Sequence, residues 1–178
     1  MVSPYLQWVT KTSITVMWQT NESSTSVVHY GETSECKQSV SAGDAKIHEV
    51  KIPDLKPETQ YFYKVESTTD ADEKYFSPVL GFQTAVHTDT PFAFAVISDT
   101  QGNPAVSAVL AKMAWAQRPN FAVHSGDLVS TGRNKDHWLD HFFPGMRPLI
   151  DRVAFFPVLG NHEQNADHYY NYVSLPDP

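Results

Sequence analysis

Five side chains that can bind a metal ion or move a proton each come shortly after one of three short apolar stretches. They are Asp99, Gln101, Asp127, Asn161 and His162. The stretches are residues 92–97, 121–125 and 153–159. Apolar runs of this length are typical of buried strands, and for the first of them we expect burial on both faces. Because ligands of open α/β sheets bind beyond the carboxyl ends of the strands, these side chains are expected to meet at one edge.

The five residue types suit a pair of metal ions that hydrolyse phosphate esters. Carboxylates, carboxamide oxygens and imidazoles all bind such ions, and one ligand must bridge two ions that are typically about 3.5–4 Å apart. Asp127 is the natural bridge, because a carboxylate has two oxygens and Gly126 before it lets the backbone turn tightly. Asp99 is a candidate ligand of the first ion and Asn161 of the second. His162 is a candidate general acid or charge stabiliser.

From residue 91 onward the apolar spacing alternates between strands and helices. A helix is predicted over residues 104–117, with Asn103 as its N-cap and a proline in its first turn. Its apolar residues recur at helical spacing: Val106, Val109, Leu110 and Met113. A second helix is predicted from near Asn134 to an interruption at Pro144 and Gly145, with four side chains facing inward: Trp138, Leu139, Phe142 and Phe143. Strand, helix, strand, helix, strand implies an α/β layered unit with parallel strands.

Residues 1 to about 86 show the alternation of apolar and polar residues that predicts strands. The predicted strands are residues 13–19, 27–30, 46–52, 58–66 and 75–84. Polar turn-forming stretches separate them: residues 21–24, 41–44, 53–57 and 69–72. Short strands with polar turns are typical of a β-sandwich. Residues 85–91 are short and end in proline, which favours a restrained hinge. The domains are therefore predicted as residues 1–87 and 88–178.

Composition excludes several classes of protein and site. The formal net charge is −7, which argues against the broad basic surface of non-specific nucleic-acid binding but leaves a nucleotide open as a substrate. Hydrophobic residues make up 41% of the chain, enough for a folded core. The single cysteine, Cys36, allows neither an internal disulfide nor a cysteine-based zinc site. No apolar run approaches membrane-spanning length, and no signal peptide precedes Val2.

Four segments of the β half carry a resemblance to a known domain. They are residues 4–7, 13–20, 28–31 and 55–65, the last with the pattern Leu-Lys-Pro-x-Thr-x-Tyr-x-Tyr. They resemble the fibronectin type III-like domain that precedes the catalytic domain of purple acid phosphatases. Such sandwiches occur on many proteins, so this resemblance alone implies no enzyme.

The strand-end motifs carry a second resemblance. Asp99-x-Gln101, Gly126-Asp127 and Gly160-Asn-His-Glu163, in this order, resemble the first three signature blocks of the calcineurin-like metallophosphoesterase superfamily, to which purple acid phosphatases belong. The resemblance implies a dinuclear centre of divalent or trivalent ions (Mn, Fe or Zn). In it Asp99 binds the first ion, Asp127 bridges, Asn161 binds the second ion and His162 assists catalysis. The implied substrate is a phosphorylated small molecule, and the family favours export.

The sequence departs from the superfamily pattern in three ways. Gln101 stands where histidine is common, and we keep it as a candidate ligand through its carbonyl oxygen. Ser130 stands where purple acid phosphatases have a tyrosine ligand, so no purple iron site is expected. The later histidine blocks do not occur before Pro178. We therefore expect an N-terminal portion of a phosphoesterase that is inactive alone and exposes an unpaired sheet edge.

Several interpretations stay open. The chain can be a binding or scaffolding module that has lost catalysis, or an enzyme that acts on phosphodiesters or nucleotide pyrophosphates rather than phosphomonoesters. His124 is interpreted as a satisfied strand histidine, and the pair His137 and His141 as a solvated helix face. Three further residues are ambiguous between surface and site roles: Arg133, Asp140 and Glu163. His168, beside Tyr169 and Tyr170, is a separate candidate for a place near a substrate entrance.

Overall fold

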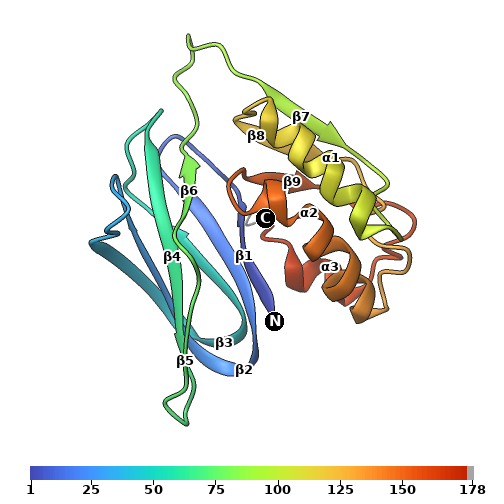
Figure 1. Cartoon of the computed structure of the whole chain (residues 1–178), viewed down its shortest axis with the longest axis horizontal. Helices are drawn as coiled ribbons and strands as arrows, with labels where there is room; N and C mark the ends of the chain where they lie inside the picture. Colours follow the sequence, from blue (N-terminus) through green and yellow to red (C-terminus); the bar gives the residue numbers. More distant parts are fainter. Residues whose placement is uncertain (176–178) are drawn as a thin grey trace.

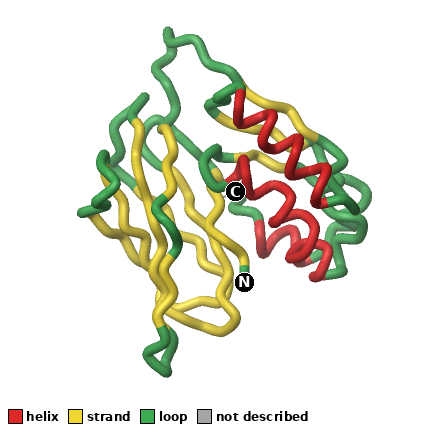
Figure 2. The backbone as a smooth tube through the Cα atoms, viewed as in Figure 1, coloured by secondary structure: helices red, strands yellow, loops and turns green. Residues whose placement is uncertain are grey.

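The computed structural model describes residues 1–175 and consists of an all-strand half followed by a half that mixes strands and helices (Figure 2). The first half contains β1 (Val2–Gln7), β2 (Ile14–Gly31), β3 (Gln38–Ile52), β4 (Gln60–Thr68), β5 (Lys74–Phe76) and β6 (Leu80–Gln83). The second half contains β7 (Phe94–Ile97), α1 (Pro104–Ala116), β8 (Phe121–His124), the π-helical turn η1 (His137–Phe142), α2 (Phe143–Ile150), β9 (Phe155–Pro157) and α3 (Asp167–Tyr172). The predicted order of a β domain before an α/β domain is confirmed.

The first half is a fibronectin type III-like β-sandwich in which all strand pairs are antiparallel. The long strand β2 joins its layers, because its first part pairs with β1 and β3 and its last part with β3 and β4. Alternate side chains of β4 point inward as predicted, with Tyr61, Tyr63 and Val65 buried. Together with Trp18 and Phe82 they form much of the sandwich core.

Two stretches predicted as turns in the sandwich are continuous strand instead. Residues 21–24 lie inside β2 and residues 41–44 inside β3. The two strands stay paired here, with Ser24 opposite Ala45, although the register shifts after Gln19. The prediction was wrong because polar, exposed residues resemble a turn in sequence, whereas pairing with a partner strand keeps them extended.

His48 is fully buried beneath this pairing. Its ring stacks on Trp18 with the centroids 4.4 Å apart, and its two nitrogens lie 2.9 Å from the Thr20 hydroxyl and 2.8 Å from the Ser26 hydroxyl. A neutral imidazole has one donor and one acceptor, so two hydroxyls satisfy it. Burial lowers the pKa of His48 to about 4, against the opposing effect of the Asp44 carboxylate. This histidine is structural.

We expect the free energy of unfolding to decrease as the pH is lowered, because His48 is buried in its neutral form. Its folded-state pKa lies below the ordinary value of 6.5, so the unfolded chain takes up the proton more readily. The contribution is complete above pH 6.5 and decreases as the pH falls towards 4, by about 2 kcal/mol between pH 7 and 5. Urea unfolding of the wild type and of His48→Gln at both pH values measures it. A difference between the two proteins that is the same at pH 7 and pH 5 would contradict the assignment.

The second half is built on a parallel three-stranded sheet in the order β7-β8-β9, as the sequence predicted. Figure 1 shows α1 and α2 side by side next to this sheet. One face of the sheet, with Ala95, Ile97 and Phe155, packs into the core that the helices share. On the other face Phe94 is 54% and Val96 is 62% exposed. The prediction that the first strand of the sheet, β7, is buried on both faces was therefore wrong for the part of the chain described.

Strand β7 also lies at an edge of this sheet. Within residues 1–175, β8 is the only strand that pairs with β7, so its second edge has no partner and the expected unpaired edge is confirmed. Helix α1 begins as predicted, with the Asn103 side chain accepting the Val106 amide. Its apolar stripe lies outside, however, with Val106, Val109, Leu110 and Met113 each about half exposed.

Small residues face the core from α1 because α2 approaches closely. Ser107 and Ala111 are the buried residues of α1. A methyl group at Gly145 of α2 would lie 3.0 Å from the Ser107 Cβ and 3.2 Å from the Pro104 Cα. Larger side chains at these contacts would force the helices apart. The close pairing therefore places the large apolar residues of α1 on its outer face.

The interruption predicted at Pro144 and Gly145 was wrong, because η1 runs directly into α2 through these residues. Pro144 lies in the first turn of α2 directly after the π-helical turn η1, where the regular i→i−4 bonding is already replaced. The inward-facing aromatic residues are confirmed, with Trp138, Phe142 and Phe143 buried. No helix among residues 1–175 is long and apolar enough to span a membrane.

The two halves share an interface made by β1 and the C-terminal residues of the structure. The Tyr5 hydroxyl donates to the Tyr172 carbonyl at 2.9 Å, and the Tyr172 hydroxyl donates to Gln19 Oε1 at 2.6 Å. The Tyr63 hydroxyl donates to the Asp151 carbonyl at 2.8 Å. Val2 and Tyr5 also belong to the same apolar cluster as Phe143 and Phe155. The sandwich thus holds the helical half at several separate points.

Candidate metal centre

The loops after β7 and β8 lie against each other, as the strand-end argument predicts. The Asp99 amide donates to the Gly126 carbonyl at 3.3 Å. The buried Thr100 hydroxyl contacts the Leu128 carbonyl at 3.2 Å and His124 Nε2 at 3.0 Å. These contacts bring the backbone of the Asp99 loop to the start of the loop that carries Asp127.

Asp127 also contacts the loop after β9, which carries Asn161 and His162. Its Oδ1 accepts the His162 amide at 3.0 Å. A methyl group at Gly160 would lie 2.1 Å from Asp127 Oδ1, and one at Gly126 would lie 2.8 Å from the Gly160 Cα. Gly126 in addition has φ +106°, which side chains rarely adopt. Two glycines are therefore required for this contact between the loops.

The geometry of His162 identifies the ring nitrogen that is free for proton transfer. Its Nδ1 lies 2.8 Å from the Ser130 carbonyl. A carbonyl oxygen can only accept, so Nδ1 carries a proton and Nε2 is the position that gains or loses one. The hydrogen bond to Ser130 raises the pKa of His162 above its ordinary value, and the negative charges of Asp127, Glu163 and Asp99 act in the same direction. A raised pKa favours the form that can act as an acid.

Two buried polar atoms near these loops have no hydrogen-bond partner within the described residues. They are Gln101 Oε1 and His124 Nδ1. Burial lowers the pKa of His124 to about 4, although the charges of Asp99 and Asp127 raise it. The interpretation of His124 as a fully satisfied strand histidine therefore holds for Nε2 alone. A buried carbonyl oxygen without a donor, as at Gln101, is available to a cation.

The candidate ligand residues offer oxygen atoms of the kinds that bind metal ions. Among residues 1–175, no group of three or more His, Cys, Asp and Glu side chains is close enough to hold a metal by itself. The predicted ligand set does not depend on such a group, since it pairs the carboxylates of Asp99 and Asp127 with the carboxamide oxygens of Gln101 and Asn161. Carboxylate and amide oxygens suit hard ions. The ligand assignments stay predictions.

The sequence left the role of Glu163 ambiguous, and the structure defines it. It is fully buried, and its carboxylate accepts backbone N–H groups from the loops after β8 and β9. Its place as the fourth residue of the Gly-Asn-His-Glu motif was the only available signal. Arg133, which was also ambiguous, and His168 line one hollow together with Asn165 and Asp167. Asp140, the third ambiguous residue, is exposed on η1.

The remaining histidine interpretation is only partly correct. His137 and His141 stack with their centroids 5.2 Å apart on η1 and are partly exposed. Their Nδ1 atoms are nevertheless buried and have no partner within the described residues, so this is not a fully solvated face. Cys36 is buried and free, away from the strand ends.

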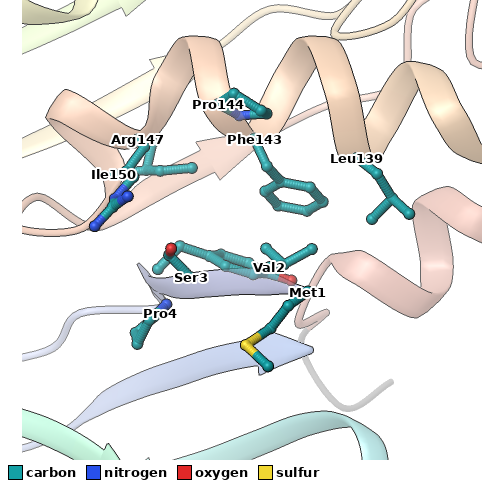
Figure 3. A pocket seen from close by; sticks show the side chains of 10 residues that line it. Met1, Val2, Ser3, Pro4, Leu139, Phe143, Pro144, Arg147 and Ile150 are labelled. Carbon is teal, nitrogen blue, oxygen red and sulfur yellow. The ribbon is translucent and has the colours of Figure 1, made fainter. Parts of the chain in front are cut away.

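A partly open hollow elsewhere in the molecule is not part of this site. A cavity of about 220 Å³ lies between β1 and the helical segment η1–α2, with Val2 and Pro4 on one side and Leu139, Phe143 and Ile150 on the other (Figure 3). None of the five predicted site residues lines it. It is a packing gap of the interface between the two halves.

Two family models match the chain, one in each half. Residues 92–178 match the family described as calcineurin-like phosphoesterase. The α/β half of the chain is therefore similar to the calcineurin-like metallophosphoesterases. Residues 2–84 match the family described as purple acid phosphatase, N-terminal domain. A search of curated proteins found no match.

Two solved structures share the fold. The purple acid phosphatase PPD1 from yellow lupin (Lupinus luteus) seeds has a TM-score of 0.80 at 14% identity, covering 98% of this chain and 40% of that one. A structure of PhoD has a TM-score of 0.69 at 13% identity, covering 90% of this chain and 38% of that one. At such identities the likeness shows the fold alone. The chain spans about two fifths of the length of these proteins, and the boundary at residues 87 and 88 stays a prediction.

Proposed function

We propose that this chain carries part of a dinuclear metal centre that hydrolyses phosphate esters. The observation that supports it most is the contact between Asp127 and the loop of Asn161 and His162, where Asp127 Oδ1 accepts the His162 amide at 3.0 Å. No hydrogen bond within the described residues reaches Asp127 Oδ2, which leaves that oxygen for a cation. The family match to calcineurin-like phosphoesterases supports the same chemistry.

Each residue has a defined part in the proposed reaction. Asp127 would be the ligand shared by the two ions, Asp99 and Gln101 would hold the first, and Asn161 would hold the second. When bound, the ions supply Lewis acidity and neutralise charge on the phosphate. His162, with Nδ1 held by Ser130, donates a proton from Nε2 to the leaving-group oxygen or stabilises its charge.

The substrate class stays open between a phosphomonoester, as for an acid phosphatase, and a phosphodiester. The metals are two divalent or trivalent ions, with Mn, Fe and Zn as the candidates. The departures at Gln101 and Ser130 leave the ion identity open. Assays with p-nitrophenyl phosphate and with bis(p-nitrophenyl) phosphate, each with all three metals, separate the two substrate classes.

Asp127→Asn should remove metal binding. The substitution keeps an oxygen for the His162 amide but removes the charge and one ligand oxygen. Its effect on metal affinity should exceed the ~10–100-fold that is typical when only a supporting residue is lost. Titration calorimetry with Mn²⁺ and Zn²⁺ measures it. Asp72→Asn is the matched control, because Asp72 is an exposed aspartate with a similar positive φ (60° against 58°) in a sandwich turn. Equal affinity in both variants would sink the proposal and favour a binding module without catalysis.

A further inference from the structure

The carboxylate of Glu163 lies at the centre of the two loops that carry Asp127, Asn161 and His162. Its Oε2 accepts the amides of Gly160 at 2.6 Å and Asp127 at 2.9 Å. Its Oε1 accepts the amides of Leu128 at 2.7 Å and Val129 at 3.2 Å. Four backbone donors therefore surround one carboxylate, and they come from both loops.

Glu163 is fully buried, yet within the described residues no lysine or arginine forms an ion pair with it. A buried carboxylate without a cation is costly unless hydrogen bonds satisfy both oxygens. The successive N–H groups of Asp127, Leu128 and Val129 form a concave anion site of the kind that backbone turns provide. The conformation of this loop and the charge of Glu163 therefore depend on each other.

The main chain of Glu163 is fixed as well. A methyl group at Gly132 would lie 2.0 Å from the Glu163 carbonyl oxygen, so Gly132 packs directly on it. The Ala166 amide donates to the same oxygen at 3.0 Å, and the Gly132 amide donates to the His162 carbonyl at 2.8 Å. Because Glu163 is held on both sides, the loops that it connects have little freedom to separate.

We infer that Glu163 is the positioning residue of the proposed centre and sets the placement of Asp127 relative to Asn161 and His162 before any metal binds. It acts through Asp127, because both of its own oxygens are used by amides and neither is free for an ion. The Asp127 amide is held by Glu163 while Asp127 Oδ1 is held by the His162 amide, which fixes the direction of the carboxylate. Only the part of this inference that concerns metal binding rests on the proposed function.

Glu163→Gln tests this with little change of volume. Glutamine keeps one acceptor oxygen but presents an NH₂ donor at the other position, so two of the four amides lose their acceptor. We expect metal affinity to fall ~10–100-fold, as for other residues that support ligands. We also expect the visible absorption of the Co²⁺-saturated protein to change, which a mere loss of stability would not cause. Glu22→Gln, at an exposed sandwich position, removes the same charge and should behave as wild type.

Amide hydrogen exchange of the metal-free chain provides a second readout. In the wild type the amides of Asp127, Leu128, Val129 and Gly160 should be protected, and in Glu163→Gln their exchange should be faster by at least tenfold. Wild-type affinity and an unchanged Co²⁺ spectrum in Glu163→Gln would overturn the inference. If the wild type binds no metal, the proposed function fails, and the exchange rates alone decide the inference. If Glu163→Gln does not fold, unprotected amides in the wild type would still overturn it.

Discussion

Replacing Gly160 with alanine should abolish metal binding and lower stability by about 1–3 kcal/mol, the usual range for overpacking. The added methyl group would lie 2.1 Å from Asp127 Oδ1 and 2.4 Å from the Asp127 amide nitrogen. Neither atom is the end of a flexible side chain, because Asp127 is held by the amide of His162 and by Glu163. The loops after β8 and β9 must therefore move apart.

Thermal unfolding and a metal titration measure the two effects of this change. Gly43→Ala is the matched control, because nothing lies within 4 Å of a methyl group at that position of β3. We expect the control to keep both the melting temperature and the metal affinity. Unaltered metal affinity in Gly160→Ala would mean that close contact between these loops is not required for the site.

Trp138→Ala should have the largest effect on stability, a loss of about 3–5 kcal/mol. Trp138 is fully buried on η1 and packs against Phe142 and Tyr172, with centroids 6.0 and 5.7 Å away. Its Nε1–H donates to the Gly132 carbonyl at 2.9 Å. Since domains are typically stable by only about 5–15 kcal/mol, this loss is a large part of the total.

Two further variants help to interpret the effect of Trp138→Ala: one separates its hydrogen bond from its packing, and the other is a comparison at a second tryptophan. Trp138→Phe keeps most of the aromatic packing but loses the bond to Gly132, so it should cost about 1 kcal/mol for the hydrogen bond plus a smaller packing term. Trp115→Ala is a comparison at a partly exposed tryptophan that lies under Arg118 at 4.2 Å, and it should cost less than Trp138→Ala. Urea unfolding measures all three. A loss in Trp138→Ala no greater than in Trp115→Ala would contradict the structure at η1.

The sequence by itself determined the order of a β half before an α/β half, most of the strands and helices, and the strand-end positions of the candidate site. These features depend on local patterns. Alternation with period two marks β4, the Asn103 cap and the following proline mark α1, and glycines mark the turns before Asp127 and Asn161. The order of three motifs after three strands also predicted that their loops would meet, because the carboxyl ends of parallel strands lie at one edge.

Only the tertiary structure decided which faces are buried, where strands continue and what Glu163 does. Val96 and Met113 have the apolar character of core residues but are exposed, because burial depends on what packs across from them rather than on residue type. Residues 21–24 have the composition of a turn but lie inside β2, with Ser24 opposite Ala45 of β3. Four amides that belong to two different loops surround Glu163. Such contacts join residues 34 to 36 positions apart, or only three for Gly160, and no local pattern in the sequence records that they share one acceptor.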